Sequence, residues 1–487
     1  MKTNNSIEET LMVTVDPSTI EELQVDDTKR GLGFALLALS AAGLIVSLQQ
    51  TVVIPLLPQL ATQLHTNVAG VTWLFTGALL AGAVATPLLS RFGDMYGKKR
   101  MILLCMCTLI AGSIICAFAN SLGTYIAGRS LQGISAAMIP LAIGLIRDLF
   151  PRERLTTAIG VVSGTIGVGG TVGMLITGLI ANETTNPHPV FWLTAGLGVA
   201  ATALIATTIK DVGVRHGGKP DYAGAILLAT LLVCLLLAIS EGPQWGWTSR
   251  SVVGLFGAAT VLCVIWILVE LKVSQPLVRL PLLVGAKSLS ANLASAFLGF
   301  AMFGFISLMS NFVQTPHEKF GYGLSGSVLA VGLYGVPTAV LMTFFSFQAG
   351  RIVARIGAAY TLAIGAAFAG SASLWLAAFN THGYDMVISN ILQGTGFGIG
   401  YAALGTLAVQ HVSMGESGIA SGINALVRTA GGSIAGALTA SILSAYTIAG
   451  TDFPTLHGYI ISFTILGVGA LIAAAIAVGH GLKYRGE

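Results

Sequence analysis

The sequence predicts an all-α membrane protein with fourteen transmembrane spans, and three observations lead to this fold class. Hydrophobic residues make up 54% of the 487 residues and charged residues only 9%, with a mean hydropathy of +0.83. A soluble domain carries about 25% charged residues, so most of this chain must face lipid. Long apolar runs recur along the sequence, and lysine and arginine concentrate in alternate connections between these runs.

A helix needs about 20 apolar residues to cross the hydrocarbon core of a bilayer. Runs of this kind predict spans at 32–57, 70–91, 101–120, 123–148, 155–181, 189–208, 221–240, 251–271, 288–313, 325–348, 358–379, 384–410, 417–447 and 459–482. Residues 1–30 are polar and acid-rich, end in Lys29-Arg30, and predict a cytoplasmic tail. The five cysteines lie inside apolar runs and are interpreted as small buried hydrophobic residues.

The distribution of positive charge tests this span count independently, because cytoplasmic loops of membrane proteins are enriched in Lys and Arg. If both termini are cytoplasmic, 20 of the 24 basic residues fall in cytoplasmic segments. The outer loops hold only Arg250 and Lys319, and Arg129 and Arg428 fall inside spans. The asymmetry predicts a multi-pass protein with both termini on the cytoplasmic side.

An internal repeat divides the chain. Leu-Gln-Gly at 131–133 recurs at 392–394, Gly97 is matched by Gly357, and the glycine pair at 169–170 by the pair at 431–432, all at offsets of 260 to 262 residues. Such a duplication is typical of transporters whose substrate site lies between two rocking halves. We therefore predict a cytoplasmic tail (1–30), an N-terminal six-helix bundle (31–208), a linker with two extra transmembrane helices (209–284), and a C-terminal six-helix bundle with a short cytoplasmic tail (285–487).

Several motifs stand in a characteristic order. A basic loop, Ser-Arg-Phe-Gly-Asp-Met-Tyr-Gly-Lys-Lys-Arg, occupies 90–100, and Arg129 precedes Leu-Gln-Gly in span four. Span five carries glycines at 164, 167, 169, 170, 173 and 178, and Trp-Gly-Trp follows span seven at 245–247. In span thirteen, Gly-Ile-Ala-Ser-Gly-Ile-Asn at 418–424 leads to Arg428 and a glycine pair. From about residue 31 to 482 the sequence resembles the major facilitator superfamily, specifically its fourteen-span drug/proton antiporter branch.

The resemblance implies a major facilitator fold, with two six-helix bundles plus two inserted helices, and export of small molecules by alternating access. It also implies a gating role for the loop residues Asp94, Gly97 and Arg100. We expect Asp94 to form a latch between spans of one half, beside helix N-terminal amides and cations; the alternative is that the basic cluster only sets topology. Ser90 and Met95 depart from the family pattern of this loop.

The glycines of span five, Gly169, Gly170 and Gly173 among them, predict close contact with a neighbouring helix. In the family the matching segment lies between the halves and is thought to control leak. The proline of the family motif is missing here, with Leu175 at its place, so the kink that proline would introduce is not expected.

Two arginines inside spans are the strongest candidates for functional residues. A guanidinium within the bilayer is energetically costly and usually faces a water-filled cavity or a partner. Arg129 lies about six residues into span four, so the alternative for this side chain is that it reaches back to the outer interface. Arg428 lies about eleven residues into span thirteen, too deep to do so easily. We expect it to pair inside the bundle with amides or backbone carbonyls.

Uncharged polar residues inside spans predict a neutral substrate cavity, with helix packing as the alternative for each of them. With the two arginines, the candidate cavity residues are Gln49, Gln50, Trp73, Thr76, Gln132, Asn311, Gln314, Tyr334, Asn390, Gln393 and Asn424. Phe303 and Phe312 are further aromatic candidates. Asn390 and Gln393 occupy the repeat positions of Arg129 and Gln132.

Energy coupling is where the sequence departs most from the family pattern. No Asp or Glu lies deep in any predicted span, and Gln49 stands where the antiporter branch typically carries an Asp. A glutamine cannot carry a proton through a transport cycle, so proton coupling through span one is not expected. The remaining candidates for coupling are Asp94, Glu241 and Asp385.

These observations favour an exporter of a hydrophobic or amphipathic small molecule. The alternative is a facilitative or exporting transporter for a lipid or specialised metabolite without proton coupling. We find no zinc-protease, nucleotide-binding or hydrolase motif, so we expect no enzyme activity, cofactor or metal. The expected partners are a small-molecule substrate and the lipid bilayer, without nucleic acid, for a monomer in the inner (plasma) membrane.

Overall fold

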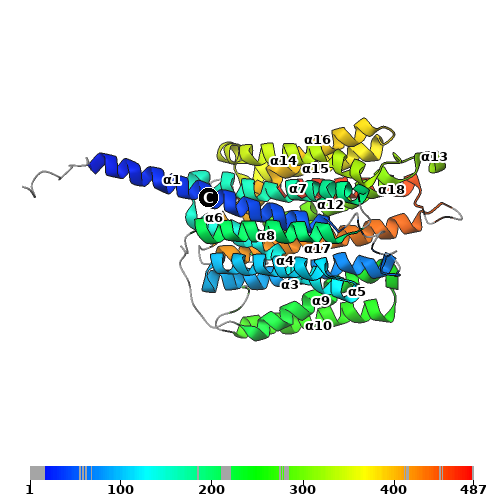
Figure 1. The fold of residues 1–487 in the computed structure, drawn as a ribbon, viewed down its shortest axis with the longest axis horizontal. Coiled ribbons are helices and arrows are strands. Elements are labelled where there is room, and N and C mark those ends of the chain that lie inside the picture. Colours follow the sequence, from blue (N-terminus) through cyan, green and yellow to red (C-terminus); the bar gives the residue numbers. More distant parts are fainter. Residues whose placement is uncertain are drawn as a thin grey trace, which may run out of the picture.

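The computed structural model describes residues 17–53, 56, 60, 63–66, 68–183, 186–209, 221–273, 276, 278, 285–410, 412, 416–448, 451 and 453–484. Its long helices run side by side along one axis, and α1 projects beyond the others at one end (Figure 1). The all-α prediction is confirmed, since the described chain is helical apart from its connections and one isolated β-bridge.

The helices before residue 209 are α1 (Pro17–Thr51), α3 (Val68–Tyr96), α4 (Lys98–Ala117), α5 (Leu122–Gly133), the short 3₁₀ helix η2 (Ile134–Ala137), α6 (Met138–Leu149), α7 (Arg152–Glu183) and α8 (His188–Thr208). A middle pair follows, α9 (Tyr222–Trp245) and α10 (Arg250–Lys272). The remaining helices are α12 (Ala286–Gln314), α13 (His317–Phe320), α14 (Val328–Ile356), α15 (Ala358–Ala378), α16 (Gly383–Gln410), α17 (Ser417–Ala445) and α18 (Leu456–Lys483).

Thirteen helices of the described chain are long and apolar enough to cross a membrane. The predicted span 384–410 corresponds to α16, which has the length but falls outside this set. Most of α16 is buried, including Asn390 and Gln393, because it packs against α14, α15 and α7. A helix enclosed by protein does not need an apolar surface toward lipid, which explains its more polar composition.

The fourth predicted span is one element, built from α5, η2 and α6, with a 3₁₀ segment inside it. Pro140 lies one turn after the 3₁₀ segment and has no N–H to donate back along the helix. Gly133, at the start of that segment, packs directly on the backbone of Ala78 in α3. The missing hydrogen bond and the close contact together account for the local change from α-helix to 3₁₀ helix.

Two glycine turns mark the repeat in the structure. Gly97 separates α3 from α4 with φ of 112°, and Gly357 separates α14 from α15 with φ of 84°. Such positive φ values are readily adopted only by glycine. We call the end of the bundle at which α3 meets α4 the basic end, because Lys98, Lys99 and Arg100 lie there. Both ends of the described chain lie at this end (Figure 1).

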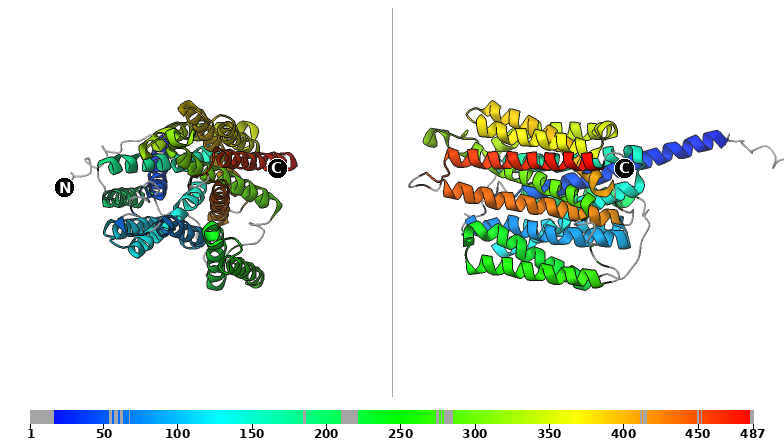
Figure 2. Two further views of the ribbon diagram at one scale, coloured as in Figure 1. Left: turned by 90° about the vertical axis from the view of Figure 1, so that its right-hand side faces the viewer. Right: turned by 180° about the vertical axis from the view of Figure 1, so that it is seen from behind.

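Equivalent helices pack in equivalent ways in the two parts of the chain. In α7, Gly169 packs on the backbone of Leu44 in α1, and in α17, Gly431 packs on the backbone of Ala296 in α12. Helices α9 and α10 pack on each other and form an outlying pair, seen end-on in Figure 2 (left), while α9 also contacts α3 and α17. We refer to α1–α8 as the N-terminal helices and to α12–α18 as the C-terminal helices.

Candidate functional site

Arg129 lies inside the N-terminal helices and is only 1% exposed. Its Nη1 donates to Gln49 Oε1 at 3.0 Å, to the Gln49 carbonyl at 2.9 Å, and to Gln132 Oε1 at 2.6 Å. Its Nε donates to the Leu74 carbonyl at 3.3 Å. The side chain therefore does not reach back to the interface, and neutral oxygens from α1, α3 and α5 surround the charge. Four acceptors make this burial tolerable without a carboxylate.

The network continues away from the charge. Gln132 Nε2 donates to Ser113 Oγ in α4 at 2.7 Å, and Thr194 Oγ1 in α8 donates to the same hydroxyl at 3.2 Å. Ser113 in turn donates to the Leu109 carbonyl at 2.8 Å. Gln132 thus holds Arg129 with one end of its amide and Ser113 with the other. Five helices meet around this buried chain of hydrogen bonds.

A second polar position lies between the N-terminal and C-terminal helices, around a small cavity of about 10 Å³. Arg428 of α17 lines it, and the guanidinium carbon sits 5.1 Å from the ring centroid of Tyr401 in α16. This is a cation–π contact. The remaining lining comes from α6, α7, α16 and α17: Ile139, Pro140, Ile143, Ser163, Ile166, Gly405, Ala408, Ser421, Asn424 and Ala425.

Of the predicted cavity residues, Asn424 and Arg428 line this cavity. Asn424 is buried and joins α17 to α12: Ser295 Oγ donates to Asn424 Oδ1 at 3.1 Å, and Asn424 Nδ2 donates to the Ala291 carbonyl at 3.3 Å. The amide is thus largely engaged in helix packing. The expected amide and carbonyl acceptors for Arg428 are replaced by the ring of Tyr401.

The other predicted cavity residues lie elsewhere. Asn390 ties α16 to α14, since Thr338 Oγ1 donates to Asn390 Oδ1 at 2.8 Å. Gln393 is 1% exposed, and neither atom of its amide has a hydrogen-bond partner among the described residues. Asn311 and Gln314 are exposed near the end of α12. In this structure these residues therefore do not share one cavity, because they have different neighbours, and the single polar cavity stays a prediction.

The predicted aromatic residues of the cavity also lie at separate places in the structure. Phe312 is buried in a cluster with Tyr459 and Phe463, and Tyr334 packs beside Gly383 at the start of α16. Thr76 is buried in α3, while Gln50, Trp73 and Phe303 are partly exposed, and the ring of Phe303 packs on Gly432. Phe312 therefore packs in the core, as its alternative interpretation held, and does not line the cavity. Tyr401 and Ser421 line the cavity although sequence reasoning did not single out either as a cavity residue.

Asp94, at the end of α3, caps the start of α17. Its carboxylate is buried and accepts hydrogen bonds from the backbone N–H of Gly418 at 3.1 Å and of Ile419 at 2.9 Å. These amides belong to the first turn of a helix, where backbone N–H groups have no acceptor within the helix and a negative charge is favoured. We predicted a latch between spans of one half, and this is corrected: the amides that Asp94 binds come from the C-terminal helices.

Cations complete this latch within the N-terminal helices. Lys98 Nζ lies 3.2 Å from Asp94 Oδ1 and 2.6 Å from Asp148 Oδ2, so it bridges α3 and α6. Arg147 donates to the carbonyl of Val412, across the same junction. Arg100, the other gating candidate, is exposed in the first turn of α4. The basic end is therefore closed by contacts between both sets of helices.

The glycines of α7 lie on two faces of this helix, which contact α1 and α14. Gly169 and Gly173 meet the α1 backbone, and Thr51 of α1 donates to the Gly170 carbonyl at 2.9 Å. Gly160, Gly164, Gly167 and Gly178, on the other face, pack on α14. The three glycines that we had singled out therefore hold α7 within the N-terminal helices, and their neighbours hold it to the C-terminal helices. Leu175, at the place of the missing proline, packs on Gly332 of α14.

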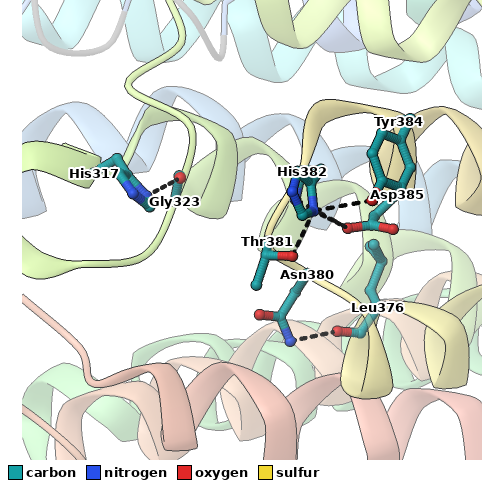
Figure 3. Close-up of polar contacts among 8 residues, drawn as sticks. All are labelled: His317, Gly323, Leu376, Asn380, Thr381, His382, Tyr384 and Asp385. Atoms are coloured by element: carbon teal, nitrogen blue, oxygen red, sulfur yellow. Dashed lines mark hydrogen bonds and ion pairs between the residues drawn. The ribbon is translucent and has the colours of Figure 1, made fainter.

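The two other acid candidates lie at the end opposite the basic end. Asp385 is 3% exposed at the start of α16, where it accepts from the backbone N–H of His382 at 2.9 Å; the His382 ring lies 3.8 Å away (Figure 3). Glu241 is also 3% exposed, near the end of α9. Beside it, Trp247 Nε1 donates to Ser441 Oγ of α17 at 3.1 Å. Neither acid contacts Arg129 or Arg428.

The sequence matches the model of the Major Facilitator Superfamily over residues 39–436. The tetracenomycin C resistance and export protein of Streptomyces glaucescens is 25% identical over 414 residues, which cover 84% of this chain and 75% of that protein. The multidrug transporter protein MdtP of Bacillus subtilis (strain 168) is 27% identical over 413 residues, 83% of this chain and 74% of that protein.

A solved structure has the same fold. The human organic anion transporter MFSD10 (TETRAN) superposes with a TM-score of 0.63, covering 92% of this chain and 99% of that chain at 15% sequence identity. At this identity the likeness concerns the fold alone. The family match over most of the chain, the helical architecture and the shared fold agree, and this chain is a multi-pass membrane transporter that belongs to the Major Facilitator Superfamily.

Proposed function

We propose that this protein exports a hydrophobic or amphipathic small molecule by alternating access. The observation that carries the proposal is the junction at the basic end. There Asp94 and Arg147 of the N-terminal helices bind the backbone of the C-terminal helices around residues 412–419. A cavity lies directly between the same two sets of helices. A polar latch that can break beside a central cavity is what alternating access requires. The relatives named for drug resistance and export support the direction of transport.

We further propose the orientation and organisation that the charge distribution predicts. In this proposal the basic end and both termini face the cytoplasm, the membrane is the plasma membrane, and fourteen helices cross it. Residues 31–208 and 285–487 act as the two halves, with the middle pair outside them, as in the fourteen-span drug/proton antiporter branch. The transporter works as a monomer, because both halves of its path come from one chain.

A second candidate function is transport of a lipid or specialised metabolite without proton coupling. The contact that favours it is the one between Gln49 and Arg129, because an amide stands where the branch would place a titrating acid. A neutral amide and a permanently charged guanidinium cannot exchange a proton during a cycle. In this reading any coupling runs through Asp94, Glu241 or Asp385.

Alternating access is tested by joining the two sets of helices at the basic end. Thr406 Oγ1 of α16 donates to Thr156 Oγ1 of α7 at 3.3 Å, so cysteines at both positions are close enough to pair. In a background without the five native cysteines, oxidised Thr156→Cys/Thr406→Cys protein should lose efflux of amphipathic dyes from cells, and reductant should restore it. The single variants are the matched controls. Full efflux by the cross-linked protein would contradict the proposal.

Proton coupling separates the two candidate functions. Flux from proteoliposomes is measured with and without an imposed pH gradient, using a dye that the cells export. We expect weak dependence on the gradient for the native protein. If flux collapses without the gradient and still survives neutralisation of Asp94, Glu241 and Asp385 one at a time, our account of coupling is wrong.

A further inference from the structure

Arg428 carries a charge that the protein leaves uncompensated. A guanidinium has five N–H donors, yet among the described residues none accepts a hydrogen bond from Arg428, whose contact is the face of Tyr401. The cavity that it lines contains no Asp or Glu among the described residues. A cation held inside a protein without an anion is unfavourable, so such a site attracts a negatively charged ligand.

A second donor faces the same cavity. Ser421 is 4% exposed, and its hydroxyl has no hydrogen-bond partner among the described residues. Ser421, Asn424, Ala425 and Arg428 all line the cavity and recur at the spacing of one helix face. Long side chains in a helix lean toward its N-terminus, which directs Arg428 toward Ser421. One strip of α17 thus presents a cation and an unused hydroxyl.

The opposite wall is mainly apolar, with Ser163 of α7 as the polar side chain among its described lining residues. Ile139 and Ile143 of α6 and Ile166 of α7 line the cavity from the N-terminal helices. The polar strip and the apolar wall belong to different sets of helices, so they separate when the transporter opens. At about 10 Å³ the cavity has room for about one water, so a larger ligand can bind only when the helices part.

We propose that this cavity binds an organic anion, a carboxylate or sulfonate with an apolar body. Arg428 neutralises the acid group, Ser421 donates a second hydrogen bond, and the isoleucines of α6 and α7 cover the apolar part. This inference rests on the proposed export function and names its substrate class. It opposes a cationic substrate, which Arg428 would repel.

An anionic substrate also supplies a driving force. In a cell whose interior is electrically negative, an outward-moving monoanion runs down the membrane potential. This potential supports a concentration ratio of about fifty-fold per 100 mV for one charge. Export then needs no acid at position 49, in agreement with the neutral contact between Gln49 and Arg129.

The site is tested by binding to the purified full-length protein in detergent. Naphthalene-2-sulfonate, the neutral naphthalene-2-sulfonamide and 2-naphthylmethylammonium share one ring system and differ in charge. Affinity is measured by isothermal titration and by thermal stabilisation. We expect the sulfonate to bind about tenfold or more tightly than the sulfonamide, and the ammonium ion to bind most weakly. Equal binding of all three, or tightest binding of the ammonium ion, would overturn the proposal.

Variants of the cavity residues test whether the preference for the sulfonate arises at this cavity. Arg428→Gln should remove the advantage of the sulfonate, and Arg428→Lys should keep part of it. Arg351→Gln, at an exposed arginine bonded to Gln348, is the matched control and should change nothing. Ser421→Asp places an anion beside Arg428 on the same strip and should remove the advantage of the sulfonate over the ammonium ion. Unchanged sulfonate binding in folded Arg428→Gln protein would overturn the assignment.

Flux measurements distinguish a failure of this inference from a failure of the proposed function. Proteoliposomes loaded with naphthalene-2-sulfonate are given a potassium diffusion potential with valinomycin, negative inside, at equal pH. Faster efflux than at zero potential, lost in Arg428→Gln, is the expected result. Anion-selective binding without any flux would reject export and leave the binding site standing. Flux of the ammonium ion in preference to the sulfonate would reject the anion site and leave export standing.

Discussion

The two arginines inside the bundle have opposite surroundings. Arg129, in the N-terminal helices, is 1% exposed, and four oxygens from three helices accept its hydrogen bonds. Arg428, in the C-terminal helices, faces a cavity and the ring of Tyr401, without a hydrogen bond to any described residue. A satisfied charge holds helices together, whereas an unsatisfied one is available to a ligand. The comparison therefore favours a structural role for Arg129, and the binding role of Arg428 is our proposal.

The repeat extends this contrast beyond the arginines. Around Arg129, Gln132 and Ser113 form a continuous chain of hydrogen bonds. Their counterparts 261 and 260 residues later, Gln393 and Ser373, are equally buried but have side-chain polar atoms without partners among the described residues. At these repeat positions the N-terminal helices thus form a connected polar network, whereas the matching groups of the C-terminal helices lack partners among the described residues. The contrast holds for these positions, since Ser40, Ser47 and Ser90 of the N-terminal helices also have hydroxyls without such partners.

The largest expected effect is on protein stability, when each of the two arginines is replaced by methionine. Arg129→Met should destabilise the protein by about 2–4 kcal/mol, because the side-chain oxygens of Gln49 and Gln132 lose their donor at a cost of about 1–3 kcal/mol each. Arg428→Met should change stability by less than about 1 kcal/mol, since a cation–π contact of about 0.5–2 kcal/mol is lost together with an uncompensated charge. Unfolding of the two variants in detergent measures both values. Equal destabilisation would remove the distinction between the arginines.

The next effect concerns the contact at the basic end that holds the N-terminal and C-terminal helices together. Asp94→Asn removes the charge that binds two α17 amides and Lys98, and hydrogen bonds to a charged group contribute about 1.5–3 kcal/mol. The closed population should fall about tenfold or more relative to the open one. The rate of cross-linking between cysteines at 156 and 406 reports this population. Asp148→Asn is the matched control, since it leaves the contact between Asp94 and α17 in place; an unchanged rate in Asp94→Asn would contradict the latch.

A third change tests whether the neutral partner of Arg129 sets the energy coupling. Gln49→Asp places a titrating group beside the guanidinium, and transport should acquire a dependence on the pH gradient, with a limit of about tenfold per pH unit for one coupled proton. Gln50→Asp is the control, because Gln50 has no contact with Arg129 among the described hydrogen bonds. Flux of both variants from proteoliposomes, with and without a pH gradient, gives the answer. Identical responses would show that position 49 does not control coupling.

The helices could be predicted from the sequence because lipid demands long apolar runs. The predicted span 155–181 became α7, Arg152–Glu183, and 384–410 became α16, Gly383–Gln410. The 3₁₀ segment η2 was not predicted, because Pro140 was not considered within an apolar run. The residues that could become buried charges were predicted as well, since a guanidinium inside a span is conspicuous in any sequence.

Partners of these residues could not be predicted, because they come from packing between distant helices. Asp94 binds the amide of Gly418, 324 residues away. The sequence around Asp94 does not indicate that its partner lies in a distant helix and not in its own loop. Tyr401 lies in a run of glycine and apolar residues where an aromatic side chain indicates a packed core as readily as a site. Asn390 and Gln393 were predicted to share a cavity with Arg428, but the rotation of α16 directs Asn390 toward Thr338 of α14.

The smallest expected effect compares two serines at equivalent repeat positions. Ser113 accepts from Gln132 and donates to the Leu109 carbonyl, so Ser113→Ala should cost about 1 kcal/mol, the net contribution of a typical buried hydrogen bond, and more if Gln132 then holds Arg129 less firmly. Ser373, equally buried, has a hydroxyl without a partner among the described residues, so Ser373→Ala should be neutral or slightly stabilising. Parallel unfolding measurements on the two variants isolate the hydrogen bonds, because the atoms deleted are the same. A loss for Ser373→Ala as large as that for Ser113→Ala would show that the C-terminal helices satisfy their polar core after all, and the contrast between the two arginines would lose its structural basis.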